Sequence, residues 1–494
     1  MALQRFKNMD PRWLALSVTT IGSFMSILDS TIVNIALPSI LRDFHADIRQ
    51  GQLVLTIYLL ALAVIIPLSG FLADRVGMKR LYIVTLICFV AGSLLCGFAW
   101  NLPSLIVFRA LQGLGGGLLQ PLGMAIVFTM ITPLERGRFM GMLGLPMLLA
   151  PIMGPTLGGY LVEYASWRTI FLINLPIGLI NLVLAIWLLK ETTRRPEARL
   201  DVPGFFLALF AFPPLLLALS EGEERGWTSP LVLGLLTIGV ASLIAFIRVE
   251  LRQREPLLQL RLFEKPVFRL GMLLNFVTQF SLFGMQFVLP LMLQQVHRLG
   301  AAATGLILFP SGIATFLAMN FSGRVYNRVG PKPLAIGGLL ILLFTTAMLS
   351  RTTPGTSLTL IGALASLRGL AMGLCNMPVQ TAAFNTVARD QMTRATAISN
   401  VLFRIYGAVS TAALTTILLV SLRSNGAPAG STITDPNTPV AFLSSAFNVA
   451  FLVMAAMAVV GIVLSLFLRD EVLDNLRNKT VLKEAKSLQL EPAD

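Results

Sequence analysis

Long apolar runs, separated by short polar segments, dominate the chain from near its start to near its end. An α-helix needs roughly 20 apolar residues to cross a bilayer. Fourteen runs approach or exceed that length: 13–40, 53–72, 81–98, 105–130, 139–160, 170–189, 202–219, 231–247, 268–294, 304–321, 333–349, 358–381, 395–421 and 440–468. The pattern predicts an all-α membrane protein with fourteen transmembrane helices.

Composition supports a membrane protein. Of the 494 residues, 55% are hydrophobic and 13% are charged, whereas soluble domains carry about 25% charged residues. The 40 Gly and 27 Pro fall largely inside the apolar runs, where membrane helices tolerate them. The first run is longer than the roughly 7–15 residues of a signal-peptide core, so we expect it to remain as the first membrane helix.

The net charge of +14 lies mostly between the apolar runs, which argues against a nucleic-acid partner, because that would need a basic face on a soluble fold. With the N-terminus in the cytoplasm, 28 of the 38 Lys and Arg fall on the inner side, seven on the outer side and three inside helices. This asymmetry follows the positive-inside rule. It predicts that both termini are cytoplasmic.

An internal repeat links the segments after the second and tenth runs. The first copy is Gly70, Asp74, Arg75, Gly77 and Lys79, and the second, at identical spacing, is Gly323, Asn327, Arg328, Gly330 and Lys332. Repeats of this kind build transporters whose substrate site lies near the bilayer midplane between the repeats. We therefore predict a six-helix bundle in 1–190, a linker with two inserted helices in 191–265, a second six-helix bundle in 266–468 and a cytoplasmic tail in 469–494.

Five motifs occur in order along the chain. They are LDSTIVNIALP at 28–38, GFLADRVGMKR at 70–80, RALQG at 109–113, APIMGPTLGG at 150–159 and WRTIFLINLP at 167–176. With these motifs the chain resembles the major facilitator superfamily, and within it the fourteen-helix drug:proton antiporters of the EmrB/QacA type. The resemblance implies a major facilitator fold and export of small lipophilic compounds across the cytoplasmic membrane. A proton gradient would supply the energy, and no cofactor is expected.

Asp29 is the only carboxylate deep within any of the fourteen runs. A charge inside a membrane helix is costly and is by default a functional hypothesis. At about 1.5 Å of rise per residue, Asp29 and Arg109 reach a similar depth in the outer half, so we predict that they touch. A carboxylate balanced between desolvation and a nearby cation can load and release a proton, so Asp29 is the expected proton carrier. The resemblance implies that Arg109 takes part in proton coupling. The alternative is structural, with Asp29 bonded to neighbours on its own helix and Arg109 to backbone carbonyls.

Two further motifs suggest movement. The resemblance implies that Gly70, Asp74, Arg75, Gly77 and Lys79 form a gating latch, in which Asp74 caps or pairs with a neighbouring helix end; the alternative is a basic turn that sets topology. Gly154, Pro155, Gly158 and Gly159 form the antiporter motif. Small residues permit close helix packing and Pro permits bending. The resemblance places this helix at a moving interface, and the alternative is simple packing.

Residues that could contact substrate are polar, aromatic or flexible side chains inside the apolar runs. They are Phe24, Met25, Gln120, Gln279, Phe283, Asn376, Gln380 and Arg404. Each could instead be a packing residue or an interhelical hydrogen bond. Arg368 and Arg404 have no carboxylate in helices nine to fourteen to pair with, so backbone carbonyls are the structural alternative. Because the cavity charge leans positive, we expect divalent cations to be poor substrates, and neutral, monocationic, zwitterionic or weakly acidic lipophiles, including a lipid, to be better ones.

Other function classes fit less well. A dedicated exporter or flippase of one metabolite or lipid is the alternative within transport, and a non-transporting sensor could share the fold. A membrane enzyme is disfavoured, because no helix offers a nucleophile–base pair, a carboxylate dyad or a His-rich metal site. The expected partners are a small lipophilic substrate, protons and membrane lipids. We expect a working monomer, and docking of a periplasmic adaptor protein stays an open alternative.

Overall fold

The computed structural model describes residues 10–469 except 47, 193, 196, 198, 254, 426–432 and 434–437. Regular secondary structure in this part of the chain is helical throughout. The helices are α2 (Pro11–Phe44), α3 (Ile48–Ile65), η1 (Ile66–Leu68), α4 (Ser69–Val76), α5 (Met78–Gly97), α6 (Leu102–Met130), α7 (Pro133–Leu143), α8 (Leu145–Tyr164), α9 (Thr169–Leu172), α10 (Asn174–Leu188), α11 (Val202–Arg225), α12 (Pro230–Arg252), η2 (Leu260–Glu264), α13 (Pro266–Gln295), α14 (Ala301–Val329), α15 (Pro331–Leu349), α16 (Leu358–Asn385), η3 (Arg389–Gln391), α17 (Met392–Ser424) and α18 (Val440–Ser465).

Among the described residues, 13 helical segments are long and apolar enough to cross a membrane. They coincide with thirteen of the fourteen predicted runs. The remaining run, 139–160, is divided between the end of α7 and α8. The chain breaks at Gly144, and Pro146 follows in the first turn of α8. Proline lacks the N–H that a continuing helix would need and clashes with the preceding turn.

Two other predicted helices also contain breaks. The second is interrupted by η1, which includes Pro67, and α4 then carries the repeat motif. The sixth is divided into α9 and α10, and Asn174 is the first residue of α10. The first break lies beside Gly70 of the predicted latch, and the second lies within the WRTIFLINLP motif.

The two copies of the internal repeat adopt the same local turn. Gly77 precedes α5 with φ 93°, and Gly330 precedes α15 with φ 88°. This left-handed region of backbone conformation disfavours residues that have a Cβ atom. The repeat therefore preserves glycine at these two positions for a conformational reason.

The chain packs as two compact units. The first comprises Met1–Met130, Met142–Arg261 and Arg389–Ile417, and the second comprises Ile131–Gly141, Leu262–Ala388 and Leu418–Asp494. The predicted division of the sequence at residues 190 and 265 stays a prediction.

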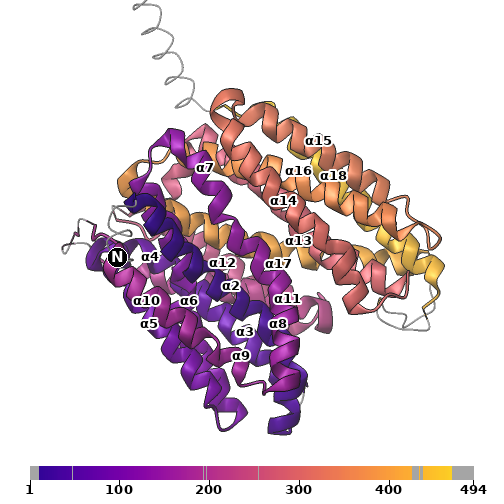
Figure 1. Cartoon of the computed structure of the whole chain (residues 1–494), viewed down its shortest axis with the longest axis horizontal. Helices are drawn as coiled ribbons and strands as arrows, with labels where there is room; N and C mark the ends of the chain where they lie inside the picture. The colour runs from indigo at the N-terminus through magenta and orange to yellow at the C-terminus, as the bar shows by residue number, and fades with distance from the viewer. Residues whose placement is uncertain are drawn as a thin grey trace, which may run out of the picture. The chain divides into compact units, whose positions relative to one another are not determined.

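Helices in each unit approach closely where glycine is present. In the first unit α5 lies along α6 and α10 (Figure 1), and a Cβ added to Gly92 would lie 2.7 Å from the Cα of Gln112. In the second unit α15 lies against α16 and α18 (Figure 1), and a Cβ on Gly338 would lie 2.7 Å from the Ala371 carbonyl oxygen. Lipid tails are apolar, so there is little hydrophobic driving force for helices to associate inside a bilayer. Close contacts at glycine stabilise the packing instead.

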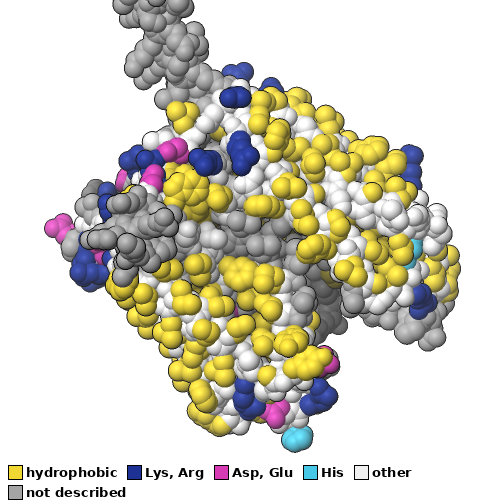
Figure 2. Space-filling model, viewed as in Figure 1, with side chains coloured by type: hydrophobic (Ala, Val, Ile, Leu, Met, Phe, Trp, Pro, Cys, Tyr) yellow, Lys and Arg dark blue, Asp and Glu magenta, His cyan; other side chains and the backbone are white. Residues whose placement is uncertain are grey.

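Large apolar side chains cover the flanks of the helices. Leu306 is 75% exposed and Trp187 is 64% exposed. Figure 2 shows hydrophobic side chains spread over the visible face, while Lys and Arg lie in a few separate groups. A soluble protein rarely exposes so large a contiguous apolar surface, so this surface fits contact with lipid.

Candidate functional site

A buried ion pair joins α2 to α6 inside the first unit. Arg109 Nη1 lies 2.6 Å from Asp29 Oδ2, and both residues are 0% exposed. The predicted contact between these two side chains is present. A charge removed from water is tolerated only when it is paired and hydrogen-bonded, and this pair meets that condition.

Three polar side chains from three helices complete the surroundings of Asp29. Gln112 Nε2 donates to Asp29 Oδ1 at 2.8 Å, and Asn174 Nδ2 donates to the same oxygen at 3.0 Å. Ser93 Oγ accepts from Gln112 at 2.5 Å and from Asn174 at 3.1 Å. Gln112 Oε1 in turn accepts from Arg109 at 2.7 Å. The carboxylate is therefore held by donors from α6 and α10, with Ser93 of α5 behind them.

The guanidinium of Arg109 has two further kinds of partner. Its Nε donates to the Val54 carbonyl oxygen at 3.3 Å. Arg109 therefore makes both the ion pair and the backbone-carbonyl contact of the structural alternative. Its Cζ lies 4.0 Å from the centre of the Tyr58 ring and 5.7 Å from that of Phe171. Aromatic faces stabilise a desolvated cation.

One polar atom of this network has no hydrogen-bond partner among the described residues. Asn174 Oδ1 is buried and has no hydrogen-bond partner. Such an orphan acceptor is costly and could take a hydrogen bond from a protonated Asp29 or from a water molecule.

Sequence reasoning missed Gln112, Ser93 and Asn174 as site residues. Gln112 lies three positions after Arg109, on the same helix face, and Asn174 lies inside the WRTIFLINLP motif. Those two signals could have identified them. Ser93 carries no comparable signal, because serine is common in membrane helices.

The antiporter motif packs against α2 beside Asp29. A Cβ on Gly154 would meet the Thr31 side chain, and one on Gly158 would lie 2.7 Å from Ile32 Cγ1. Gly159 has no atom within 4 Å of such a Cβ, so it does not serve this contact. The side chain of Pro155 lies outside the described residues.

The predicted latch residue Asp74 forms an ion pair with a residue that sequence reasoning did not single out. Arg394 Nη2, near the start of α17, lies 2.9 Å from Asp74 Oδ2. A Cβ on Gly70 would lie 2.6 Å from Arg394 Cγ, so glycine is needed for this side chain to fit. The first unit therefore contains an ion pair between the ends of α4 and α17.

The rest of the repeat motif holds the turn before α5. Lys79 Nζ donates to the Ile186 carbonyl at 2.6 Å, and the Lys79 backbone N–H donates to Glu191 Oε1 at 3.3 Å. A carboxylate at a helix N-terminus is stabilised by the helix dipole. Arg75 lies 5.9 Å from the centre of the Phe71 ring.

The second copy of the motif makes a matching contact inside the second unit. Asn327 Nδ2 donates to the Leu134 carbonyl of α7 at 2.6 Å. A Cβ on Gly137 would lie 2.9 Å from the Gly323 carbonyl oxygen, so α7 and α14 meet backbone to backbone. Arg136 Nη1 donates to the Phe384 carbonyl at 2.6 Å. Each copy therefore contacts the start of a neighbouring helix, through the Asp74–Arg394 ion pair in the first unit and through the Asn327 amide in the second.

The predicted substrate residues are divided between the units. Met25 is fully buried in a hydrophobic core of the first unit, and Phe24, Gln120 and Arg404 of that unit are half-buried. Gln279 is buried in the second unit and its Oε1 has no partner among the described residues. Phe283, Asn376 and Gln380 are half-buried there. Their role in binding stays a prediction.

The two arginines without carboxylate partners differ in surroundings. Arg368 Nη2 donates to the Ser281 carbonyl and, at 2.8 Å, to Ser281 Oγ. Arg368 thus has the backbone-carbonyl partner that the structural alternative describes. Arg404, by contrast, lies half-buried in α17.

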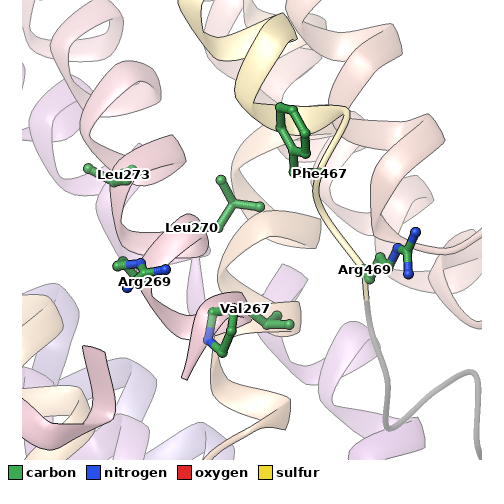
Figure 3. A pocket seen from close by; sticks show the side chains of 7 residues that line it. Val267, Arg269, Leu270, Leu273, Phe467 and Arg469 are labelled. Atoms are coloured by element: carbon green, nitrogen blue, oxygen red, sulfur yellow. The ribbon is translucent and has the colours of Figure 1, made fainter. Parts of the chain in front are cut away.

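A surface cavity of about 260 Å³ lies within the second unit (Figure 3). Arg269 and Arg469 flank it, and Leu270, Leu273 and Phe467 form apolar walls. None of the predicted substrate residues lines this cavity. In the described part of the chain, no group of three or more His, Cys, Asp or Glu is arranged to hold a metal ion.

Comparison with known proteins agrees with the fold and the motifs. Residues 19–411 match the Major Facilitator Superfamily. The chain belongs to that family. It is a multi-pass membrane transporter, and the members of this family are transporters rather than enzymes.

Relatives in this family include proteins named for drug resistance. The multidrug transporter protein MdtP of Bacillus subtilis (strain 168) is 33% identical over 78% of this chain and 71% of its own length. The lincomycin resistance protein LmrB of Listeria innocua is 30% identical over 91% of this chain and 95% of its own length. A crystal structure of the human organic anion transporter MFSD10 (TETRAN) aligns with TM-score 0.66 at 16% identity, covering 92% of this chain and 100% of that one. At that identity the structural match supports the fold alone.

Proposed function

We propose that this protein exports small lipophilic compounds across the cytoplasmic membrane in exchange for protons. The observation that carries the proposal is the fully buried Asp29–Arg109 pair, with its shell of Gln112, Asn174 and Ser93. Relatives named for multidrug transport and lincomycin resistance support the export of drugs.

In the proposed mechanism Asp29 is the proton carrier. In the arrangement described here its oxygens accept hydrogen bonds from three side chains, which suits an ionised carboxylate. A proton arriving from the outer side would neutralise Asp29 and weaken its attraction for Arg109. Loss of that attraction would release α2 from α6 and so favour another conformation.

Helix α8 is the element best placed to transmit this change. Its Gly154 and Gly158 contact α2 at Thr31 and Ile32, within one helical turn of Asp29. The Asp74–Arg394 pair between α4 and α17 would act as a latch that opens and closes in the same cycle.

The proposed substrates are neutral, monocationic, zwitterionic or weakly acidic lipophiles. Arg109, Arg368 and Arg404 outnumber Asp29 among the charged side chains of the predicted helices. A dication would meet net repulsion, since the energy of two like charges rises steeply in a low-dielectric interior.

Transport by purified protein in proteoliposomes with an imposed pH gradient tests the proposal. A panel of lipophilic dyes together with lincomycin serves as substrate. We expect accumulation that a protonophore abolishes and that Asp29→Asn loses, while Asp29→Asn still exchanges substrate down its own gradient. Asp10→Asn is the matched control on the same helix, since Asn also caps helices well.

Gradient-driven accumulation at full rate in Asp29→Asn would overturn the coupling assignment. Accumulation of one compound alone from the panel would replace drug export with a dedicated exporter.

A further inference from the structure

Two buried carboxyl groups meet at the base of the hairpin formed by the inserted helices α11 and α12. Asp201 is the N-cap of α11 and is 6% exposed, and Glu250 lies near the end of α12 and is 1% exposed. Sequence reasoning found no carboxylate dyad within a helix, because both residues lie just outside the predicted runs. The structure extends α12 to Arg252 and brings the two together.

One oxygen of each carboxyl group is satisfied by N–H donors. Asp201 Oδ1 accepts from the Gly204 backbone at 2.9 Å and from Gln253 Nε2 at 3.3 Å. Glu250 Oε2 accepts from the Leu258 backbone at 3.1 Å. These contacts fix the orientation of both groups.

The other oxygen of each group, Asp201 Oδ2 and Glu250 Oε1, is buried and has no hydrogen-bond partner among the described residues. Both face the same point above the backbone. A Cβ added to Gly204 would lie 2.6 Å from Asp201 Oδ2 and 2.7 Å from Glu250 Oε1. Two ionised carboxylates that share a buried site repel each other, and one of them then keeps its proton.

The charged side chains near Glu250 include Asp201 and, on α17, Arg394. Arg394 is already paired with Asp74 at 2.9 Å. Glu255, in the segment after α12, accepts from the Arg199 backbone at 3.0 Å. In the described part of the chain neither Asp201 nor Glu250 has a cation within ion-pair distance.

We propose that Asp201 and Glu250 form a proton-binding site, in which Glu250 holds one proton at neutral pH and donates it in a hydrogen bond to Asp201. Asp201 is the acceptor because its N-cap role requires a side-chain oxygen facing N–H groups. The bound species is a proton rather than a divalent cation. Calcium takes about six to eight oxygen ligands, and these two carboxyl groups have no third acidic, His or Cys ligand beside them. The shared proton links Asp201, at the start of α11, to Glu250, in the last turn of α12.

This site also affects the latch. Loss of the proton would create a second anion acting on Arg394, in competition with Asp74. The inference does not depend on the export function, because it concerns a proton bound in the resting protein.

Infrared spectroscopy of the purified protein tests the site directly. At neutral pH we expect a carbonyl band from a protonated carboxylic acid that Glu250→Gln removes. Glu255→Gln, in the adjoining segment, is the matched control and should leave the band in place. Persistence of the full band in Glu250→Gln would overturn the assignment, and so would its absence from the unaltered protein.

Thermal unfolding gives a second measurement. The folded protein would hold a proton that the unfolded chain releases, so the Tm should fall as pH rises from mildly acidic to alkaline values. Glu250→Gln and Asp201→Asn each keep a hydrogen-bond donor and an acceptor between the two side chains, so both variants should fold. Each removes one of the two titrating carboxyl groups, so this part of the pH dependence of the Tm should be lost. If the Tm of the unaltered protein instead rises with added Na⁺ or Ca²⁺ at constant ionic strength, the site binds a metal cation and the proton proposal is wrong.

Discussion

At the scale of single residues, the protein contains two contrasting ion pairs of nearly equal length. Arg109 and Asp29 are 2.6 Å apart and almost completely buried, whereas Arg168 and Asp43 are 2.8 Å apart with about a third or more of each side chain exposed. Distance alone does not separate them. Burial does, because water screens the exposed pair and not the buried one.

We therefore expect Arg109→Ala to destabilise the protein far more than Arg168→Ala. Removing Arg109 leaves the Asp29 charge buried without its partner, which costs about 3–5 kcal/mol. Removing Arg168 breaks a surface pair worth about 0–1 kcal/mol. Thermal unfolding of both variants in the same detergent measures the difference, and equal losses of Tm would show that Asp29 is not held as an isolated buried charge.

At the scale of helices, glycine decides which faces can touch. Gly92 of α5 lies against the backbone of α6 at Gln112, next to the Ser93 hydroxyl that Gln112 and Asn174 share. Gly234 of α12 has no atom within 4 Å of an added Cβ. The same substitution should therefore act in opposite directions at these two positions.

Gly92→Ala should lower the Tm, because overpacking a close contact costs about 1–3 kcal/mol, and it should also reduce transport by displacing Gln112. Gly234→Ala should leave transport unchanged and raise stability slightly, since alanine in a helix is favoured over glycine by about 1 kcal/mol. The two variants are compared by thermal unfolding and by dye transport. A destabilised Gly234→Ala would indicate that this face of α12 is covered by a partner.

At the scale of the whole molecule, the distribution of Lys and Arg between the loops predicts how the protein is oriented in the membrane. The inner loops and termini are predicted to hold 28 Lys and Arg against seven in the outer loops. Such an excess keeps basic segments on the cytoplasmic side. The apolar flanks of the helices then lie in the bilayer and the loops lie in water on either side.

This orientation predicts which loops react with a membrane-impermeant thiol reagent. In a background where Cys88, Cys96 and Cys375 are replaced by serine, Asn101→Cys between α5 and α6 should react in intact cells. Lys190→Cys, after α10, should react only once the membrane is opened. The reverse pattern would place both termini outside and would contradict the positive-inside assignment.

The sequence alone was enough to predict the membrane helices, the repeat and the Asp29–Arg109 contact, because hydropathy, motif spacing and helical rise are local properties. Proline breaks were harder to place, since Pro121 and Pro290 lie inside continuous helices, whereas Pro146 lies beside a break. The outcome depends on whether neighbouring helices can satisfy the freed carbonyl groups.

Only the tertiary structure decided which residues from distant segments share a site. Gln112, Ser93 and Asn174 meet around Asp29, Arg394 reaches Asp74, and the orphan oxygens of Asp201 and Glu250 both lie close to the same point above Gly204. Each of these contacts joins residues on different helices, and the rotation of each helix about its axis is set by packing against several neighbours at once. Spacing along one helix contains no information about that rotation. The sequence could therefore mark Gln112 and Asn174 as candidates, but not which side chains they contact.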